Sequence, residues 1–528
     1  MSGEASKPKR CELCRRKAEI VCPACSRSYC GEKHELQDWR DHHNSCPAYK
    51  LVQEPSKPSY LVATRKIPEG AVLFVSKPLV VGPNGKGPVC LGCLCPIIYD
   101  VMSDKCPLCK WPMCFLCLQS ETHKLECQAM QNAGFSFDEN ALRGRWHNNG
   151  VFSIFPGIWL LVARVLLTGN APVLLKMYRK EDHDICDARL HPGGASFIRD
   201  TLKLKQFGTD DIYRVTRVLL KSLIDLNPTR DDYNQSKTRM GSGVHTSDVI
   251  HLQHSCLPNI KLIETYEEPE ILKAIAAADI AEGEMLCNAK YNFSVFCTRE
   301  RLFAKLCTCL RCVDPTELGL YLGSYRCQDC PGTMIPKWPL QPLLLIYTCE
   351  KCRVSKDCLP LEVKINQELV SLMDGKDLYE LAKFIDKHTG PKGFLHCNHY
   401  RILIAKLCYC EFVFKQTSTK GAAFQFSTSV LQRFYKYTHE LMTVFSKLRL
   451  ESYVIDYQSK MMRSRHIVHD WVKGNLSTKK AEVQLSLMLQ EAQVMMNSFR
   501  IMDRNEKITI MNTYMELFSC WQRIHPPK

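Results

Sequence analysis

The sequence predicts an α+β protein of several domains, with cysteine-rich modules, a small sheet and a helical C-terminal region. Its 528 residues are too many for one compact domain. Its 30 cysteines are concentrated in pairs of the form C-x2-C, which predict compact modules held by metal. Beyond Pro360, apolar residues recur at spacings of three and four, which is typical of amphipathic helices.

The composition indicates a protein of the cytosol or nucleus. The N-terminal residues MSGEASKPKRC are polar and lack the apolar core of a signal peptide. The longest apolar run, at 157–169, is too short for a bilayer and contains Arg164, so it predicts a buried helix and no membrane segment. In this compartment cysteines stay reduced, and C-x2-C pairs favour metal over disulfides. The net charge of +15 is spread along the chain, without a nucleic-acid recognition motif, so we expect no direct nucleic-acid binding.

The first cysteine cluster predicts two zinc sites. Zinc takes four nitrogen or sulfur ligands, and a segment this small cannot fold on an apolar core alone. The ligands are Cys11, Cys14, Cys22, Cys25, Cys30, His34, His42 and Cys46. Their spacing, with Tyr29 and Asp38-Trp39, resembles a MYND finger. The resemblance implies interleaved sites, Cys11, Cys14, Cys30 and His34 on one zinc and Cys22, Cys25, His42 and Cys46 on the other, with His43 as a possible substitute for His42.

Three further cysteine groups follow. A second MYND-like module at 90–127 would pair Cys90, Cys93, Cys114 and Cys117 on one zinc and Cys106, Cys109, His123 and Cys127 on another, leaving Cys95 spare. A ribbon-like set comprises Cys327, Cys330, Cys349 and Cys352. A third group, Cys307, Cys309 and Cys312, has only three ligands and must take its fourth from elsewhere in the chain. The remaining nine cysteines are interpreted as core thiols.

The stretch HLQHSCLPN at 251–259 supplies the missing ligand. It resembles the NHSCxPN element of SET-domain lysine methyltransferases, in which the cysteine joins the post-SET zinc and the chain forms a pseudoknot around the cofactor. The resemblance places Cys256 with the third group. The stretch 280–286 with Tyr291 matches the family's GEEL…Y element, and 67–73 repeats it earlier in the chain. Both are apolar runs broken by a Glu-Gly turn, as expected for paired short strands.

Together these motifs resemble the SET-and-MYND (SMYD) family, and the extra N-terminal finger and the ribbon resemble its arthropod-type branch. The implied fold is a split SET-domain β core with MYND modules and post-SET zinc sites, followed by an all-α C-terminal domain. The implied bounds are an N-terminal finger at 7–46, a linker at 47–58, a split SET domain at 59–300, a post-SET and ribbon segment at 301–358, and a helical domain of four to six helices at 360–528. Inside the SET domain lie the second module at 90–127, a helical insert at 130–240 and the SET core at 246–295.

The resemblance implies a protein-lysine methyltransferase that uses S-adenosyl-L-methionine, with substrates among histones or other proteins and a role in gene regulation in the nucleus and cytoplasm. Tyr291 takes the position of the catalytic tyrosine. The cofactor-binding positions are Ser59, Tyr60, Asn227, Gln253, His254, Tyr291 and Lys305. A turn or helix cap explains Asn227 equally well.

Several of these positions depart from the family pattern. The glycine-rich approach to the cofactor is replaced by the residues 57–60, KPSY, and the leading asparagine of NHSC is Gln253. A second pocket tyrosine is Phe303, and the aromatic that packs on adenine is Lys305. These departures support an alternative, a catalytically weak or inactive SET scaffold whose MYND finger binds proline-containing peptides of transcriptional co-regulators.

Overall fold

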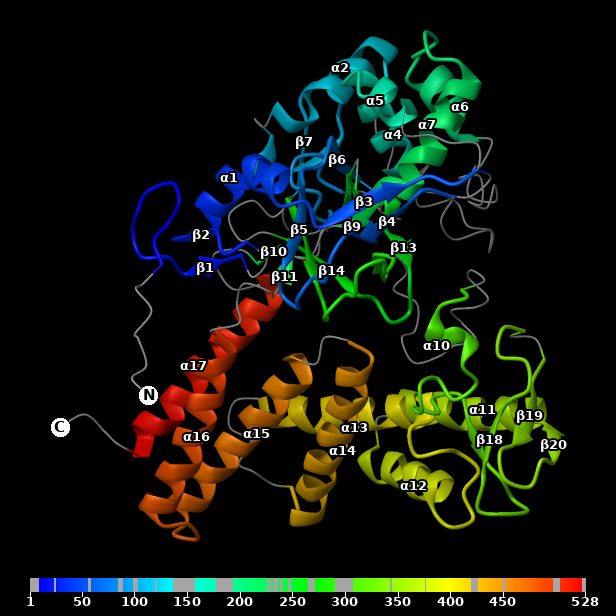
Figure 1. The fold of residues 1–528 in the computed structure, drawn as a ribbon, viewed down its shortest axis with the longest axis vertical. Coiled ribbons are helices and arrows are strands. Elements are labelled where there is room, and N and C mark those ends of the chain that lie inside the picture. Colours follow the sequence, from blue (N-terminus) through cyan, green and yellow to red (C-terminus); the bar gives the residue numbers. More distant parts are fainter. Residues whose placement is uncertain are drawn as a thin grey trace. The chain divides into compact units, whose positions relative to one another are not determined.

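The chain forms helices, short strands and cysteine-rich turns, described here from a computed structural model (Figure 1). The structure describes residues 9–22, 25–55, 58–83, 89–97, 103–118, 121–135, 157–176, 193–225, 229–230, 236–237, 241–245, 248–264, 271–289, 307–341, 344–375, 377–418, 426–449, 453–496 and 504–524. It divides into two compact units. The first comprises Met1–Leu252, Leu262–Ile275 and Ile280–Leu286; the second comprises Gln253–Lys261, Ala276–Asp279 and Cys287–Lys528.

The first unit combines small sheets with helices. Its strands are β1 (Ile20–Val21), β2 (Ser28–Tyr29), β3 (Tyr49–Val52), β4 (Tyr60–Ala63), β5 (Val72–Ser76), β6 (Val80–Pro83), β7 (Ser103–Lys105), β8 (Pro112–Cys114), β9 (Leu223–Asp225), β10 (Thr229–Arg230), β11 (Ser236–Lys237) and β12 (Gly241–Val244). Its helices are α1 (Glu32–Ser45), η1 (Phe115–Cys117), η2 (Glu121–His123), α2 (Lys124–Ala133), α4 (Gly157–Leu167), α5 (Ala171–Lys176), α6 (Gly193–Ser196), η5 (Phe197–Thr201), α7 (Thr209–Ser222) and α8 (Asp248–His251).

Two three-stranded sheets organise this unit, in the orders β6-β12-β9 and β14-β15-β5. Strands β14 (Ile260–Glu264) and β15 (Leu272–Ala276) each contain residues of both units, because the boundary between the units falls inside them. The two Glu-Gly stretches lie against each other, because Ile67 and Ile280 exchange backbone hydrogen bonds of 2.9 and 2.8 Å. Gly70 and Gly283 both have φ near +80° (79° and 80°), a conformation that glycine adopts without strain. The two repeated runs therefore pair with each other, but through an isolated bridge and not as two short strands.

The apolar run at 157–169 forms the buried helix α4, as predicted. Arg164 is 8% exposed on this helix. Its guanidinium donates to the backbone oxygens of Val81 and Leu91 and pairs with Glu126. These partners explain how an arginine lies inside an apolar helix, since a buried charge is tolerated when it is paired and hydrogen-bonded.

Two sequence interpretations need correction in this unit. The predicted linker at 47–58 contains strand β3, which pairs antiparallel with β4 from Tyr49↔Ala63 to Val52↔Tyr60. The predicted helical insert at 130–240 contains strands β9, β10 and β11 after α7 ends. Both strands β3 and β9 are short, and a short strand stabilised by its partner leaves little periodic signal in the sequence.

The second unit contains the four-stranded ribbon and the C-terminal helices. Its strands are β13 (Gln253–His254), β16 (Cys287–Asn288), β17 (Tyr325–Arg326), β18 (Thr333–Pro336), β19 (Ile346–Cys349) and β20 (Ser355–Asp357). Its helices are α10 (Leu310–Val313), α11 (Leu359–Gly375), α12 (Leu378–Thr389), α13 (Tyr400–Ser418), α14 (Thr428–Lys447), α15 (Tyr453–Val472), α16 (Thr478–Met496) and α17 (Arg504–Ile524).

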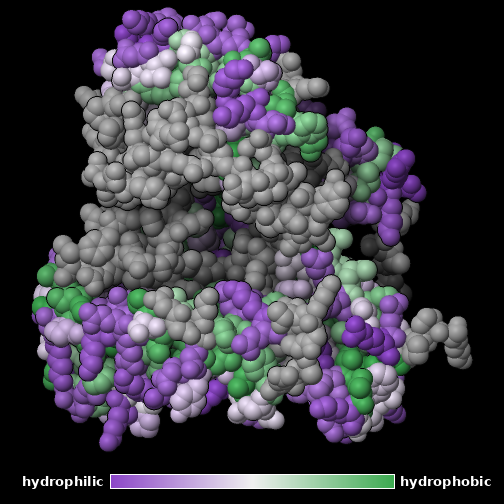
Figure 2. Space-filling view, turned by 180° about the vertical axis from the view of Figure 1, so that it is seen from behind, coloured by the Kyte–Doolittle hydropathy of each residue, from purple (hydrophilic) through white to green (hydrophobic). Residues whose placement is uncertain are grey.

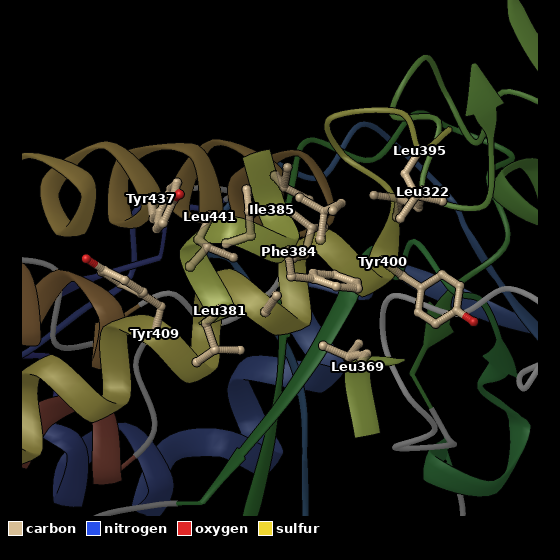
Figure 3. Close-up of a cluster of buried hydrophobic side chains, with 14 of the residues drawn as sticks. Leu322, Leu369, Leu381, Phe384, Ile385, Leu395, Tyr400, Tyr409, Tyr437 and Leu441 are labelled. Carbon is tan, nitrogen blue, oxygen red and sulfur yellow. The ribbon is translucent and has the colours of Figure 1, made fainter. Parts of the chain in front are cut away.

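The helices from α11 onward pack on one another in chain order. Contacts join α12 to α13, α13 to α14 and α15 to both α16 and α17, which lie side by side in Figure 1. Figure 3 shows the core between them, where Leu381, Phe384 and Ile385 of α12 lie near Leu441 of α14. Seven helices, α11 to α17, are present in the described part beyond 358, more than the four to six expected.

Among the described residues, no helix is long and apolar enough to cross a membrane. The face shown in Figure 2 carries many hydrophilic side chains on its described residues, with hydrophobic ones between them.

Candidate metal centres and cofactor site

The predicted zinc ligands of the N-terminal finger form two groups. Cys11, Cys14, Cys30 and His34 make one, and Cys22, Cys25, His42 and Cys46 make the other; within each group all ligand atoms lie within 4.8 Å of one another. The hairpin β1–β2 and the helix α1 place them, since α1 carries both histidines. Four cysteine or histidine donors at this spacing fit a tetrahedral zinc ion. The side chain of His43 lies outside the described residues.

The C-x2-C pairs share one backbone turn. In five of them the N–H of the residue four positions after the first cysteine donates to that cysteine's carbonyl, at 2.8–3.1 Å. That residue takes a positive φ of 61–64° in each case, at Arg15, Ser26, Leu94, Lys110 and Arg353. Non-glycine residues adopt this conformation at an energetic cost, which persists only where the surroundings impose it. The turn directs two thiols of one pair toward a common point, as a zinc site needs.

The tautomer of His42 is set by residues behind the second group. Its Nε2 lies 3.1 Å from Cys25 Sγ, and its Nδ1 lies 3.0 Å from the hydroxyl of Tyr29. That hydroxyl donates to Asp38 at 2.8 Å, and Arg27 pairs with the same carboxylate. Burial and the neighbouring Asp38 carboxylate raise the pKa of Tyr29 above its ordinary value. Tyr29 therefore stays protonated and accepts from Nδ1–H, leaving Nε2 to bind metal.

The second module also brings its predicted ligands together. Cys106, Cys109, His123 and Cys127 form one buried group within 4.8 Å. In the other, Cys93 Sγ lies 3.6 Å from Cys114 Sγ, and the thiols of Cys90 and Cys117 interact with the same pair. Cys95 is buried beside this group, with its thiol 3.9 Å from the carbonyl oxygen of Cys93.

Cys256 lies with the post-SET cysteines. Its Sγ is 3.9 Å from Cys307 and 3.6 Å from Cys312, and with Cys309 the four sulfurs lie within 4.8 Å. The ribbon set Cys327, Cys330, Cys349 and Cys352 forms a further group. The strands β17 to β20 hold this group at one end of their sheet.

The segment that contains Cys256 interlocks with β16. Strands β13 and β16 are parallel, pairing Gln253 with Cys287 and His254 with Asn288. Asn259 is 5% exposed, and its side-chain oxygen accepts the N–H of Cys287 at 2.8 Å. Asparagine is suited to this position because its short side chain brings the amide oxygen to a neighbouring backbone N–H with few rotatable bonds.

The predicted cofactor residues are described in part. Gln253 and His254 lie on β13 in the second unit, with His254 Nε2 3.4 Å from Cys256 Sγ. In the first unit Ser59 is buried, and the hydroxyl of Tyr60 donates to Glu54. Tyr291, Asn227, Phe303 and Lys305 lie outside the described residues, so their predicted roles stay predictions.

A buried charge cluster joins the N-terminal finger to the sheet, and sequence reasoning missed it. Lys273 on β15 is 2% exposed, and its Nζ lies 2.7 Å from Glu35 and 2.9 Å from Glu32, both on α1. Glu35 is 1% exposed. The signal in the sequence was a lysine in the apolar run LKAIA together with Glu-x-x-Glu on a helix, but nothing in the sequence links positions so far apart.

We expect six zinc ions per chain. The six groups are two in each MYND-type module, one that includes Cys256 and one in the ribbon, and each offers four soft or borderline donors. Elemental analysis of dialysed protein measures the number directly. A value of two or three would contradict the assignments.

Similarity to known proteins completes the description of these sites. No protein-family model matches the chain. Isoform A of SET domain-containing protein SmydA-8 of Drosophila melanogaster is 26% identical over 312 residues, which cover 54% of this chain and 62% of that protein. Isoform B is 25% identical over 334 residues, 58% of this chain and 67% of that protein. The match thus spans less than two thirds of isoform A. The resemblance that the motifs predicted is confirmed, since the chain is similar to these curated SET domain-containing proteins.

Proposed function

We propose that this protein is an S-adenosyl-L-methionine-dependent protein-lysine methyltransferase built on a split SET core with an all-α C-terminal domain. Its substrates would be lysines of histones or other proteins, and its role gene regulation in the nucleus and cytoplasm. The observation that carries the proposal is the interlocked segment 253–259. There the pairing of β13 with β16, the Asn259 amide and the Cys256 thiol meet as the SET resemblance requires.

Each residue has a defined role in this proposal. The cofactor, when bound, supplies an electrophilic methyl group. Gln253 and His254 would hold its adenosine end, and Asn227, Ser59, Tyr60 and Lys305 are the other positions at which the resemblance implies cofactor binding. Tyr291 would orient the substrate amine through its hydroxyl. The lysine must be neutral to act as a nucleophile, and an apolar channel lowers its pKa by disfavouring the charged form.

Changing Tyr291 to phenylalanine should lower methyl transfer strongly and leave cofactor affinity almost unchanged. The hydroxyl acts at the reacting centre, so its loss removes an interaction made in the transition state. Turnover on histone and non-histone peptides and calorimetric titration with S-adenosylmethionine measure the two effects separately. Tyr379→Phe is the matched control, since Tyr379 is 72% exposed on α12. An unchanged rate in Tyr291→Phe would make Tyr291 a structural residue.

The same titration decides between enzyme and scaffold. Gln253 carries one methylene more than the family's asparagine, and Pro58 with Tyr60 replaces the glycines that let backbone approach the cofactor. If wild-type protein binds no cofactor and transfers no methyl group, the inactive scaffold is the better description. Its N-terminal finger would then be tested with proline-containing peptides of co-regulators.

A further inference from the structure

The second module holds one thiol more than its two zinc groups need. Cys95 has no ligand role in the scheme that assigns Cys90, Cys93, Cys114 and Cys117 to one zinc ion. Its thiol nevertheless lies 3.9 Å from the carbonyl oxygen of Cys93 and interacts with the Cys93 thiol as well. A fifth thiol therefore lies beside a group in which a tetrahedral zinc ion takes four ligands.

The backbone places Cys95 at a fixed position of the C-x2-C turn. In six of these turns the N–H of the first cysteine donates to the carbonyl of the residue five positions later, at 2.7–3.0 Å. The six accepting residues are Arg16, Arg27, Cys95, Trp111, Gly332 and Val354. Because the other five are not cysteines, the turn forms without a thiol at this position, and the thiol of Cys95 is not a requirement of the backbone.

The equivalent glycine of the ribbon shows where a side chain at this position points. A Cβ atom added to Gly332 would lie 2.7 Å from Cys349 Sγ and 3.2 Å from Cys330 Sγ, two thiols of one zinc group. A side chain at this position of the turn therefore points toward the sulfurs that would hold the metal. At Cys95 this side chain carries a thiol, which is itself a zinc ligand once it is deprotonated.

Spacing and burial also suit Cys95 to the metal. Zinc sites use pairs of cysteines separated by roughly two to four residues, so Cys90 can act with either Cys93 or Cys95. Cys95 is 9% exposed, whereas Cys93 is only partly buried. A thiol reagent from solvent therefore reaches Cys93 more readily than Cys95.

We propose that Cys95 is a reserve ligand of this zinc site and exchanges with Cys93. In the exchange the zinc–sulfur bond to Cys93 breaks and one to Cys95 forms, while the proton of the Cys95 thiol passes to the Cys93 sulfur. Four thiolates and one thiol are present before and after, so the charge of the site is unchanged. When an electrophile blocks Cys93, the Cys95 proton is released to water and the site keeps its zinc. The proposal does not depend on methyl transfer.

The zinc content of the full dialysed chain tests this role through two variants. Cys93→Ser should keep the zinc count of the wild-type protein, because Cys95 completes the four ligands. Cys93→Ser combined with Cys95→Ser should lose one zinc ion per chain, and Cys95→Ser alone should lose none.

Cys109→Ser is the matched control. It removes the same position from the neighbouring turn of the same module, where Trp111 stands at the position of Cys95. Without a reserve thiol, this variant should lose one zinc ion per chain.

Three results would overturn the proposal. Equal zinc in Cys93→Ser and in the double variant means that Cys95 rescues nothing, whether the cause is failed folding or a water molecule in the fourth position. Loss of zinc from Cys95→Ser alone makes Cys95 a primary ligand. If Cys114→Ser keeps the wild-type zinc count, the group holds no zinc and Cys95 has no metal to bind.

Discussion

Cys256→Ser should remove one zinc ion per chain and free the post-SET cysteines from the interlocked segment. Cys256 lies 3.6–3.9 Å from two of its three partner thiols, and those three cannot complete a tetrahedral site alone. Structural zinc contributes on the order of 10 kcal/mol to the folding of small modules, so the loss should exceed that of any other single substitution considered. Zinc analysis and limited proteolysis after residue 306 measure both effects.

Cys410→Ser is the matched control for this substitution. Cys410 is 1% exposed in α13, and burial raises the pKa of its thiol, as for a thiol in an apolar core. The control variant should keep all its zinc. If Cys256→Ser also keeps its zinc and its protease resistance, Cys256 is a buried thiol and the post-SET site has another fourth ligand.

Lys273→Met should destabilise the first unit by about 3–5 kcal/mol, because it leaves the Glu35 carboxylate buried without its cation. The free energy of unfolding from urea titration, followed by zinc release from the N-terminal finger, measures this loss. Lys356→Met is the control, since Lys356 pairs with Asp329 at the surface, where both side chains are over 40% exposed. An exposed pair contributes about 0–1 kcal/mol.

A charge-free combination separates pairing from packing. Lys273→Met with Glu35→Leu and Glu32→Gln removes all three charges and keeps the side-chain volume. Replacing a whole buried ion cluster by apolar groups is often neutral, so this variant should recover most of the stability. If Lys273→Met alone unfolds like wild type, the cluster contributes nothing, and the finger is held to the sheet by other contacts.

The groups of zinc ligands could be predicted because most ligands of one site lie close together in the sequence. In each finger the spacing of the cysteines and histidines predicts zinc sites, the MYND resemblance implies which ligands share a zinc, and the structure brings those groups together. The one remote ligand, Cys256, was found only through a motif, since no spacing rule joins it to Cys307. The Glu-Gly turns at Gly70 and Gly283 could likewise be predicted, because a turn with a positive φ favours glycine at that position.

Features that depend on tertiary contacts could not be predicted. Strand β3 gave too short a pattern to separate from a linker, and β4 stabilises it across the sheet. Lys273 lies in an apolar strand, and only the fold brings the two carboxylates of α1 to it. The helices of the described C-terminal residues exceed the expected number, because apolar spacing continues across helix ends.

The remote position of Cys256 has a consequence for the order in which the chain assembles during synthesis. It is separated by 51 residues from Cys307 and by 56 from Cys312. The ligands of each finger site lie within 21 to 27 residues of one another, so at about 5–20 residues per second Cys256 waits about twice as long for its last partner as the first ligand of a finger site does. Until residue 312 is made, the thiol of Cys256 has no metal site to join and is exposed to oxidation or to a wrong metal. Closing so long a loop costs only slightly more entropy than closing a shorter one. The rate of chain synthesis therefore sets the delay, and not the free energy of loop closure.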